Sequence, residues 1–250
     1  LYRSEFLYLG REKLPSEEEL FEAYRTAAER MKGRSVIIRT LDIGADKQAS
    51  YLNLPAEENP ALGLRGLRLC LAHPELFLPQ LRAIYRASAY GNLSLMFPMV
   101  TSLWELQEAK RLCTQVCLEL EDDGVAYREI PIGIMIETPA AALEAREFAK
   151  EADFLSVGTN DLTQYTLAQD RQNAALERFF DPCHPALLKL LRSIAEAAGQ
   201  AGIWAVICGE LAGDATLAGM FLDMGYRELS MAPGRILEVR KTICEREETP

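Results

Sequence analysis

Short apolar runs alternate with longer stretches of mixed polarity along most of the chain. The short runs predict strands at residues 36–38, 93–97, 132–136, 154–157, 204–207 and 229–231. The intervening stretches predict helices over residues 16–33, 74–89, 103–121, 140–150, 185–201 and 214–224, with a last helix from Arg235. Strands that alternate with helices in this way predict parallel strands joined by right-handed crossovers.

The number of strands favours a closed barrel over an open sheet. Eight strands can be counted if a truncated first strand at Leu1 and a weak strand or helix start near residues 64–67 are included. We therefore predict an α/β fold, a (β/α)8 TIM barrel with a truncated first strand, as one domain over residues 1–250. An open doubly wound sheet is the alternative. It is disfavoured because no GxGxxG follows the first strand and polar residues follow nearly every strand.

Composition and charge exclude several classes of function. The chain has 250 residues, 49% of them hydrophobic, and a net charge of -10 without a Lys/Arg block, which argues against a nucleic-acid surface. No apolar run approaches the roughly 20 residues needed to cross a bilayer, and the first residues lack the features of a signal peptide. The six cysteines form no CxxC pair. We expect a cytoplasmic protein with reduced thiols and no membrane or nucleic-acid partner.

Polar side chains follow the predicted strands at their carboxyl ends. Glu137 follows the strand at 132–136, Asn160 and Asp161 follow the strand at 154–157, and Arg39 follows the strand at 36–38. Barrel enzymes build their sites from residues at these strand ends. The sequence therefore predicts a site on one rim that is formed by Arg3, Arg39, Arg65, Glu137, Asn160, Asp161 and Cys208.

The residue types at this rim indicate a divalent metal and an anionic substrate. The carboxylates of Glu137 and Asp161 suit Mg²⁺, whereas guanidinium groups bind phosphate or carboxylate oxygens in pairs. The two histidines, His73 and His184, do not lie at strand ends, which disfavours a histidine-based metal site. Cys208 ends an apolar strand, where it can act as a proton donor or acceptor or simply pack in the core, and the residues alone leave both alternatives open.

Several motifs in order resemble the C-terminal, phosphoenolpyruvate-binding domain of enzyme I of the bacterial phosphoenolpyruvate:sugar phosphotransferase system. They cover nearly the whole chain. The motifs are Arg3-Ser4-Glu5-Phe6-Leu7, Arg39-Thr40-Leu41-Asp42-Ile43-Gly44 with Asp46-Lys47, Glu57-Glu58-Asn59-Pro60, Glu137-Thr138-Pro139-Ala140-Ala141, Gly158 to Tyr165, Asp170-Arg171, and Cys208-Gly209-Glu210-Leu211-Ala212-Gly213-Asp214.

The resemblance implies a role for each candidate residue. It implies that Glu137 and Asp161 bind Mg²⁺, and that Cys208 protonates the enolate carbon after phosphoryl loss to give pyruvate. The residues that would grip the phosphate and carboxylate of phosphoenolpyruvate are Arg3, Arg39, Arg65, Asn160 and Arg171, with assistance from Lys47.

The resemblance also implies partners outside this chain. In the family the phosphoryl acceptor is a histidine in an N-terminal domain, and this chain begins at Leu1 without a methionine, as though cut from something longer. We expect that the fragment alone does not complete transfer to the phosphocarrier protein HPr, which is the first step of sugar uptake. The resemblance further implies a homodimer.

Three alternatives compete with this interpretation. Dikinases and phosphoenolpyruvate synthases share the barrel and many motifs, but Leu162 to Ala168 followed by Asp170-Arg171 looks more like enzyme I. A Mg²⁺-dependent lyase that works through a pyruvate enolate would use the same two acids. Its substrate needs about one arginine, whereas the predicted rim contains Arg3, Arg39 and Arg65, and this number favours a substrate that carries a phosphate. A dimerisation and ligand-sensing module is the third alternative. A fused multiphosphoryl transfer protein as the parent also stays open.

Overall fold

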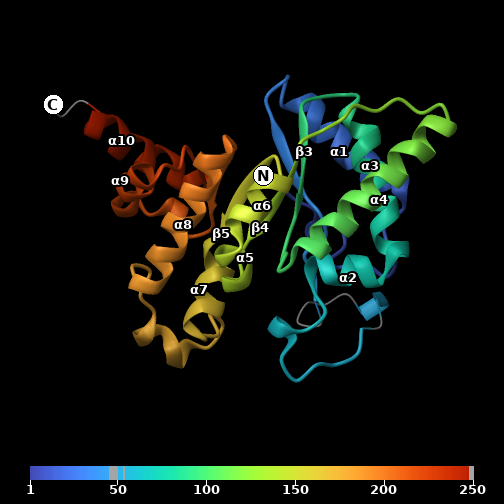
Figure 1. Ribbon diagram of the computed structural model, residues 1–250. Helices are drawn as coiled ribbons and strands as arrows, with labels where there is room; N and C mark the ends of the chain where they lie inside the picture. Colours follow the sequence, from blue (N-terminus) through green and yellow to red (C-terminus); the bar gives the residue numbers. More distant parts are fainter. Residues whose placement is uncertain (45–49, 53, 248–250) are drawn as a thin grey trace. The chain divides into compact units, whose positions relative to one another are not determined.

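The computed structural model describes residues 1–44, 50–52 and 54–247 of the chain. It divides into two units, Leu1–Gly133 and Ile134–Pro250, which are called unit 1 and unit 2 below. Unit 1 runs from blue to green in Figure 1 and unit 2 from yellow to red. Each unit consists of parallel strands joined by helices, so the predicted α/β class is confirmed.

Three parallel strands form the sheet of unit 1. They are β1 (Tyr2–Arg3), β2 (Val36–Arg39) and β3 (Leu93–Phe97), and they neighbour one another in chain order. In this register Arg3 lies opposite Arg39, so the last residues of β1 and β2 are adjacent. All of β3 and most of β2 are buried, which explains their nearly continuous apolar sequences.

The helices of unit 1 pack on one another. They are α1 (Glu17–Arg30), α2 (Gly66–Ala72), α3 (Pro74–Ser88) and α4 (Leu103–Asp122), with short 3-10 turns η1 (Ser4–Leu7), η2 (Ser50–Leu52) and η3 (Pro60–Leu62). α1 packs on α3, and α3 packs on α4. The predicted start of α1 is confirmed by a capping box, in which the Ser16 side chain accepts from the Glu19 N–H and the Glu19 carboxylate accepts from the Ser16 N–H.

The weak strand near residues 64–67 does not form, and the helix alternative is correct. Leu64 donates its N–H to the Glu57 carboxylate, and Gly66 donates to the carbonyl of Ile43. Because these backbone groups bond to a side chain and a loop, no sheet ladder forms here, and α2 begins at Gly66. Arg65 therefore precedes a helix and does not end a strand, which corrects its predicted position.

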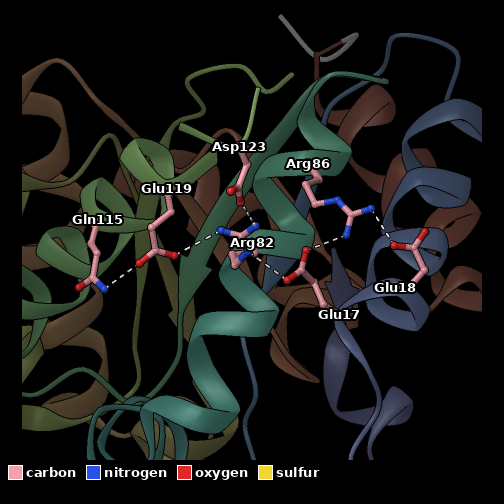
Figure 2. Close-up of polar contacts among 7 residues, drawn as sticks. All are labelled: Glu17, Glu18, Arg82, Arg86, Gln115, Glu119 and Asp123. Carbon is pink, nitrogen blue, oxygen red and sulfur yellow. Dashed lines mark hydrogen bonds and ion pairs between the residues drawn. The ribbon is translucent and has the colours of Figure 1, made fainter. Parts of the chain in front are cut away.

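A network of charged side chains joins α1, α3 and α4 (Figure 2). Arg82 on α3 lies 3.0 Å from Glu17 on α1 and 2.8 Å from Asp123 after α4, and it also contacts Glu119 at 3.3 Å. Arg86 continues the network toward α1, with Glu17 and Glu18 each at 2.7 Å. Arg82 is the residue that links three helices, and its side chain is only 20% exposed.

Replacing Arg82 with methionine is expected to lower the free energy of unfolding by about 1–2 kcal/mol at low salt and by less at high salt. The loss arises because three carboxylates lose a shared cation that is partly shielded from solvent. Urea unfolding at two salt concentrations measures this. Arg111→Met is the matched control, because Arg111 is 58% exposed and, among the described residues, pairs only within its own helix. Equal losses in the two variants would contradict the prediction.

Unit 2 continues the parallel pattern. Its strands are β4 (Ile132–Ile136), which begins two residues before the unit boundary, β5 (Phe154–Gly158), β6 (Trp204–Cys208) and β7 (Glu228–Ser230), again adjacent in chain order. Gly158 lies opposite Cys208, and Cys208 lies opposite Ser230. The carboxyl ends of β5, β6 and β7 are therefore level with one another.

The helices of unit 2 follow its strands closely. They are α5 (Pro139–Leu143), α6 (Ala145–Glu151), α7 (Thr159–Leu167), α8 (Pro185–Ala201), α9 (Ala215–Met224) and α10 (Ile236–Glu247), with turns η4 (Ala174–Phe179), η5 (Leu211–Gly213) and η6 (Pro233–Arg235). The predicted helix over 140–150 is interrupted at Glu144, whose backbone leaves the helical region. Sequence patterning did not predict α7.

The described residues form seven strands, one fewer than the eight counted from the sequence. The strand predicted at residues 64–67 accounts for the difference, since those residues start α2. A TIM-barrel-like fold is consistent with this order of strands, whereas closure into an eight-stranded barrel is not shown. None of the described helices is long and apolar enough to cross a membrane.

Candidate functional site

A buried cluster of alternating charges lies beyond the ends of β1 and β2 in unit 1. We call Glu5, Arg39, Asp42 and Arg65 the arginine cluster; each of the four is at most 8% exposed. Arg39 Nη2 lies 2.6 Å from Glu5 Oε1, and Arg39 Nη1 lies 3.1 Å from Asp42 Oδ2. Arg65 Nη2 lies 3.3 Å from Asp42 Oδ1. Asp42 thus bridges two of the four arginines predicted to bind the substrate.

The cluster suits recognition of an anion. A guanidinium has five N–H donors in a planar fork, so it can bind a carboxylate of the protein and an incoming phosphate or carboxylate at once. Burial strengthens each such contact, because the field of a charge is weakly screened away from water. The carboxylates of Glu5 and Asp42 also restrict the arginine rotamers before any ligand arrives.

Local structure explains how Arg65 enters the cluster. Arg65 precedes α2 in extended conformation, and Gly66 follows with a φ of +55°. A Cβ at Gly66 would lie 2.8 Å from the Cβ of Met99, so this position requires glycine for both its conformation and its space. The turn directs Arg65 back toward Asp42.

The other predicted cations of unit 1 are placed differently. Arg3 ends β1 beside Arg39, but it is exposed, and its guanidinium carbon lies 5.0 Å from the centre of the Phe6 ring. Lys47 lies outside the described residues. Unit 1 therefore brings Arg39 and Arg65 together through Asp42 and keeps Arg3 adjacent in the sheet.

In unit 2 the predicted metal-binding acid Glu137 follows β4 directly and is 1% exposed. Its carboxylate lies against Gly158 at the end of β5, where a Cβ would be 2.6 Å from Glu137 Oε2. Gly158 thus leaves the space that the Glu137 carboxylate uses. The two strand ends were predicted separately from the sequence, and in the structure they meet at these two residues.

Asp161, the second predicted metal-binding acid, lies in the first turn of α7 and is 8% exposed. Its Oδ2 is 3.2 Å from Arg171 Nη1, so two residues predicted for metal and substrate contact each other. Asn160, the neighbour of Asp161, accepts a hydrogen bond at Oδ1 from the Glu210 N–H, at 3.1 Å. Because Oδ1 accepts this bond, the side-chain amide of Asn160 has its oxygen on the Glu210 side, and its nitrogen can act only as a donor.

Cys208 ends β6 and is 7% exposed. Its Sγ lies 3.0 Å from Ser156 Oγ, and its carbonyl accepts a 2.7 Å hydrogen bond from the Thr159 hydroxyl. Burial raises the pKa of the Cys208 thiol, and hydrogen bonds with Ser156 and Ser230 only partly oppose this shift. The neutral thiol is therefore the form at neutral pH, which suits a proton donor better than a nucleophile.

Gly209 fixes the turn after Cys208. Its φ is +105°, and a Cβ there would lie 2.7 Å from the Thr159 hydroxyl oxygen and 2.9 Å from Asn160 Oδ1. The loop after β6 therefore packs tightly on the start of α7, and the Glu210 N–H in this loop donates to the Asn160 side chain.

Alkylation by iodoacetamide at neutral pH is expected to modify the exposed thiols of Cys183 and Cys244 at least about 100-fold faster than that of Cys208. Burial protects Cys208 from the reagent, and its raised pKa delays thiolate formation to a pH above that of an ordinary thiol. Time-resolved mass spectrometry of the peptides measures the rates. Reaction of Cys208 as fast as Cys183 at pH 7 would contradict this structure of the site.

The acids of unit 2 fit Mg²⁺ in number and chemistry. Carboxylate oxygens are the ligands that Mg²⁺ takes, and the ion is held by one or two carboxylates plus substrate oxygens and water. Among the described residues there is no group of three or more His, Cys, Asp or Glu side chains arranged to hold a metal. Glu137, which lies against Gly158, and Asp161 are the two acids that such an ion would use.

A pocket of about 440 Å³ opens beside Asn160 and Arg171 in unit 2. Arg235 and Glu238, which pair at 3.0 Å, and the N-terminus of α9 also line it. The pocket is large enough for a small phosphorylated acid, and two of the predicted substrate-binding residues line it.

Sequence reasoning did not select Glu5 and Asp42 as site residues, although both lie in the arginine cluster. The signal that could have found them is a carboxylate within three residues of a strand-end arginine, in a segment that is otherwise apolar. The prediction that all the selected residues share one rim concerns both units and stays a prediction.

Comparison with known proteins assigns the chain to a class. A family model described as "PEP-utilising enzyme, PEP-binding domain" matches residues 1–248, so the chain belongs to this family of phosphoenolpyruvate-utilising enzymes.

Within that family, the chain is similar to proteins named phosphoenolpyruvate-protein phosphotransferase. It is 50% identical to the one from Staphylococcus aureus (strain MSSA476) and 49% identical to those from Staphylococcus carnosus and Priestia megaterium, each over 97% of this chain. The chain spans only 43% of the length of these relatives. The predicted resemblance is thereby confirmed.

Solved structures support the fold alone. A Haloferax volcanii malate synthase aligns with 91% of this chain and 59% of its own at 16% identity, with a TM-score of 0.56. A citrate lyase from Burkholderia xenovorans aligns with 68% of this chain and 54% of its own at 20% identity, with a TM-score of 0.52. Structural similarity at this level of sequence identity shows a shared arrangement of helices and strands, and it does not indicate a shared function.

Proposed function

We propose that this chain is the phosphoenolpyruvate-binding part of a phosphotransferase that passes a phosphoryl group to a histidine elsewhere in a longer protein. The observation that carries the proposal is the identity of about half of all residues to proteins named phosphoenolpyruvate-protein phosphotransferase. The buried arginine cluster supports it, since a substrate with a phosphate and a carboxylate needs several guanidinium groups. The same family assignment favours phosphoryl transfer over a pyruvate-enolate lyase.

In this proposal the residues of unit 1 bind the anion. Arg39 and Arg65, held by Asp42, contact the phosphate and carboxylate oxygens, and Arg3 and Lys47 add positive charge. In unit 2 Asn160 donates its amide, and Arg171 donates its guanidinium, to substrate oxygens. These groups stabilise the charge that develops as the phosphoryl group leaves.

Two groups of unit 2 complete the chemistry. Glu137 and Asp161 would hold Mg²⁺, which supplies charge neutralisation for the phosphate and the enolate when it is bound. Cys208 gives its proton to the methylene carbon of the enolate, which yields pyruvate. The raised pKa of its thiol keeps that proton in place at neutral pH.

The wider features of the proposal rest on the resemblance of the motifs to enzyme I. They are a closed (β/α)8 barrel, a cytoplasmic homodimer, and delivery of the phosphoryl group through the histidine to the carrier HPr. The relatives named above are more than twice as long as this chain, which leaves room in them for such a histidine domain.

Calorimetric titration of this chain with phosphoenolpyruvate, first with Mg²⁺ and then with the metal chelated, tests the proposal. Saturable binding that weakens on chelation is the expected result. Absence of phosphoenolpyruvate binding in both conditions counts against the proposal, and binding of pyruvate under the same conditions would then favour the lyase.

A further inference from the structure

Glu5 is a buried carboxylate with one strong contact. It is 5% exposed, and its Oε1 accepts a hydrogen bond from Arg39 Nη2 at 2.6 Å. Among the residues that the structure describes, its other oxygen, Oε2, has no hydrogen-bond partner. A buried carboxylate oxygen without a hydrogen bond lowers the stability of the fold, so a contribution to stability does not explain why a glutamate occupies position 5. Features of this kind are typical of functional sites.

A second buried group fixes the segment that carries Glu5. Gln80 on α3 is fully buried, and its Nε2 donates at 3.0 Å to the hydroxyl of Ser4, the neighbour of Glu5. Its Oε1 accepts at 3.0 Å from the N–H of Leu41, two residues after Arg39. A third bond joins Gln80 to Tyr24 on α1. Gln80 therefore ties the segments that follow β1 and β2, which bear Glu5 and Arg39.

We propose that Glu5 is a positioning residue, whose carboxylate holds the Arg39 guanidinium in the orientation in which it meets an anionic substrate. This rests on the proposed function, in which Arg39 contacts phosphoenolpyruvate. Glu5 and Asp42 bind the two terminal nitrogens of the same guanidinium, one at Nη2 and the other at Nη1. Because both terminal nitrogens are held, the plane of the Arg39 guanidinium is fixed. Substrate binding then avoids the entropy cost of ordering this side chain.

The inference is testable, because two possible roles of Glu5 predict opposite changes in the affinity for an anion when its carboxylate is removed. If Glu5 acted only as a negative charge near the site, its removal would strengthen the binding of an anion. If it positions Arg39, its removal weakens binding although the site becomes more positive. Loss of a hydrogen bond to a charged group typically lowers the affinity about tenfold or more.

The first measurement is the affinity of Glu5→Gln for phosphoenolpyruvate with Mg²⁺ by calorimetry. We expect a dissociation constant raised about tenfold or more, and no change in the control Glu12→Gln, which removes an equal charge from an exposed position of the same unit. Affinity that is unchanged or higher in Glu5→Gln overturns the inference. Glu5→Asp, which keeps the charge but shortens the side chain, is expected to bind weakly as well, and it serves if Glu5→Gln does not fold.

A second measurement does not depend on phosphoenolpyruvate. Phenylglyoxal modifies accessible arginines, and mass spectrometry gives the rate at Arg39, with the partly exposed Arg25 as internal reference. Arg39 is expected to react at least about fivefold faster in Glu5→Gln than in the parent and Glu12→Gln, because loss of the charge-assisted bond to Glu5 leaves the guanidinium held at Nη1 but no longer at Nη2. An unchanged rate overturns the inference. If the parent binds no phosphoenolpyruvate, the proposed function fails, while this rate still decides whether Glu5 holds Arg39.

Discussion

Arg39→Ala is expected to weaken phosphoenolpyruvate binding at least about 100-fold, the largest loss among single substitutions in unit 1. The substitution removes the N–H donors of a buried guanidinium, and it leaves the carboxylates of Glu5 and Asp42 without the cation that both contact. Those two negative charges then face an anionic substrate. Loss of attraction and gain of repulsion act in the same direction, which is why the effect exceeds that of a single hydrogen bond.

The same substitution is expected to lower the free energy of unfolding by about 3 kcal/mol, since it breaks a buried ion pair from one side. Arg39→Lys separates the two effects, because it keeps the charge and loses the fork, and we expect a loss in affinity of roughly tenfold. Calorimetry and urea unfolding measure both quantities. Arg30→Ala, at an exposed position of α1, is the control. Normal affinity of Arg39→Ala for phosphoenolpyruvate would show that the arginine cluster does not bind the substrate.

Gly158→Ala is expected to abolish the Mg²⁺ dependence of phosphoenolpyruvate binding. A Cβ at this position would lie 2.6 Å from Glu137 Oε2, 3.0 Å from Glu137 Cβ and 3.1 Å from the sulfur of Met135. The Glu137 carboxylate must move away from the new Cβ, and the Glu137 Cβ and the Met135 sulfur must each give by a few tenths of an ångström. A metal ligand displaced in this way no longer matches the strict geometry that Mg²⁺ requires.

Overpacking at a buried strand end also lowers stability, by about 1–3 kcal/mol for Gly158→Ala. Gly199→Ala is the matched control, because a Cβ there meets nothing within 4 Å in the last turn of α8, and alanine is expected to stabilise that helix by at most about 1 kcal/mol. Titration of each variant with and without Mg²⁺ provides the test. Retention of the full metal effect in Gly158→Ala would exclude Glu137 as a ligand.

The order of elements could largely be predicted from the sequence. The strands at 93–97 and 132–136 and the helix at 185–201 form with the predicted bounds. They could be recognised because apolar runs and amphipathic stretches are local patterns with clear ends. The segment at 64–67 was ambiguous, because its outcome depends on distant partners, the Glu57 carboxylate and the carbonyl of Ile43. Such partners have no local signature.

Individual charges of the candidate site were predictable, but their pairing was not. Strand ends indicated Arg39, Glu137 and Asp161 one at a time. The contacts that give them their properties, Glu5 with Arg39 and Arg171 with Asp161, join residues whose approach depends on the tertiary structure. Gln80 shows the same limit, because a polar residue in an apolar helix face is recognisable, while its three partners are not.

The contact between Arg171 and Asp161 has a thermodynamic consequence for the proposed function. An arriving cation competes with Arg171 for the Asp161 carboxylate, and a displaced Arg171 becomes available to substrate oxygens. Metal and substrate are then coupled ligands. By linkage, the factor by which Mg²⁺ tightens phosphoenolpyruvate binding must equal the factor by which phosphoenolpyruvate tightens Mg²⁺ binding. If Asp161 binds the metal and Arg171 binds the substrate as proposed, the ion pair makes their occupancy cooperative, so that each ligand binds more tightly when the other is bound.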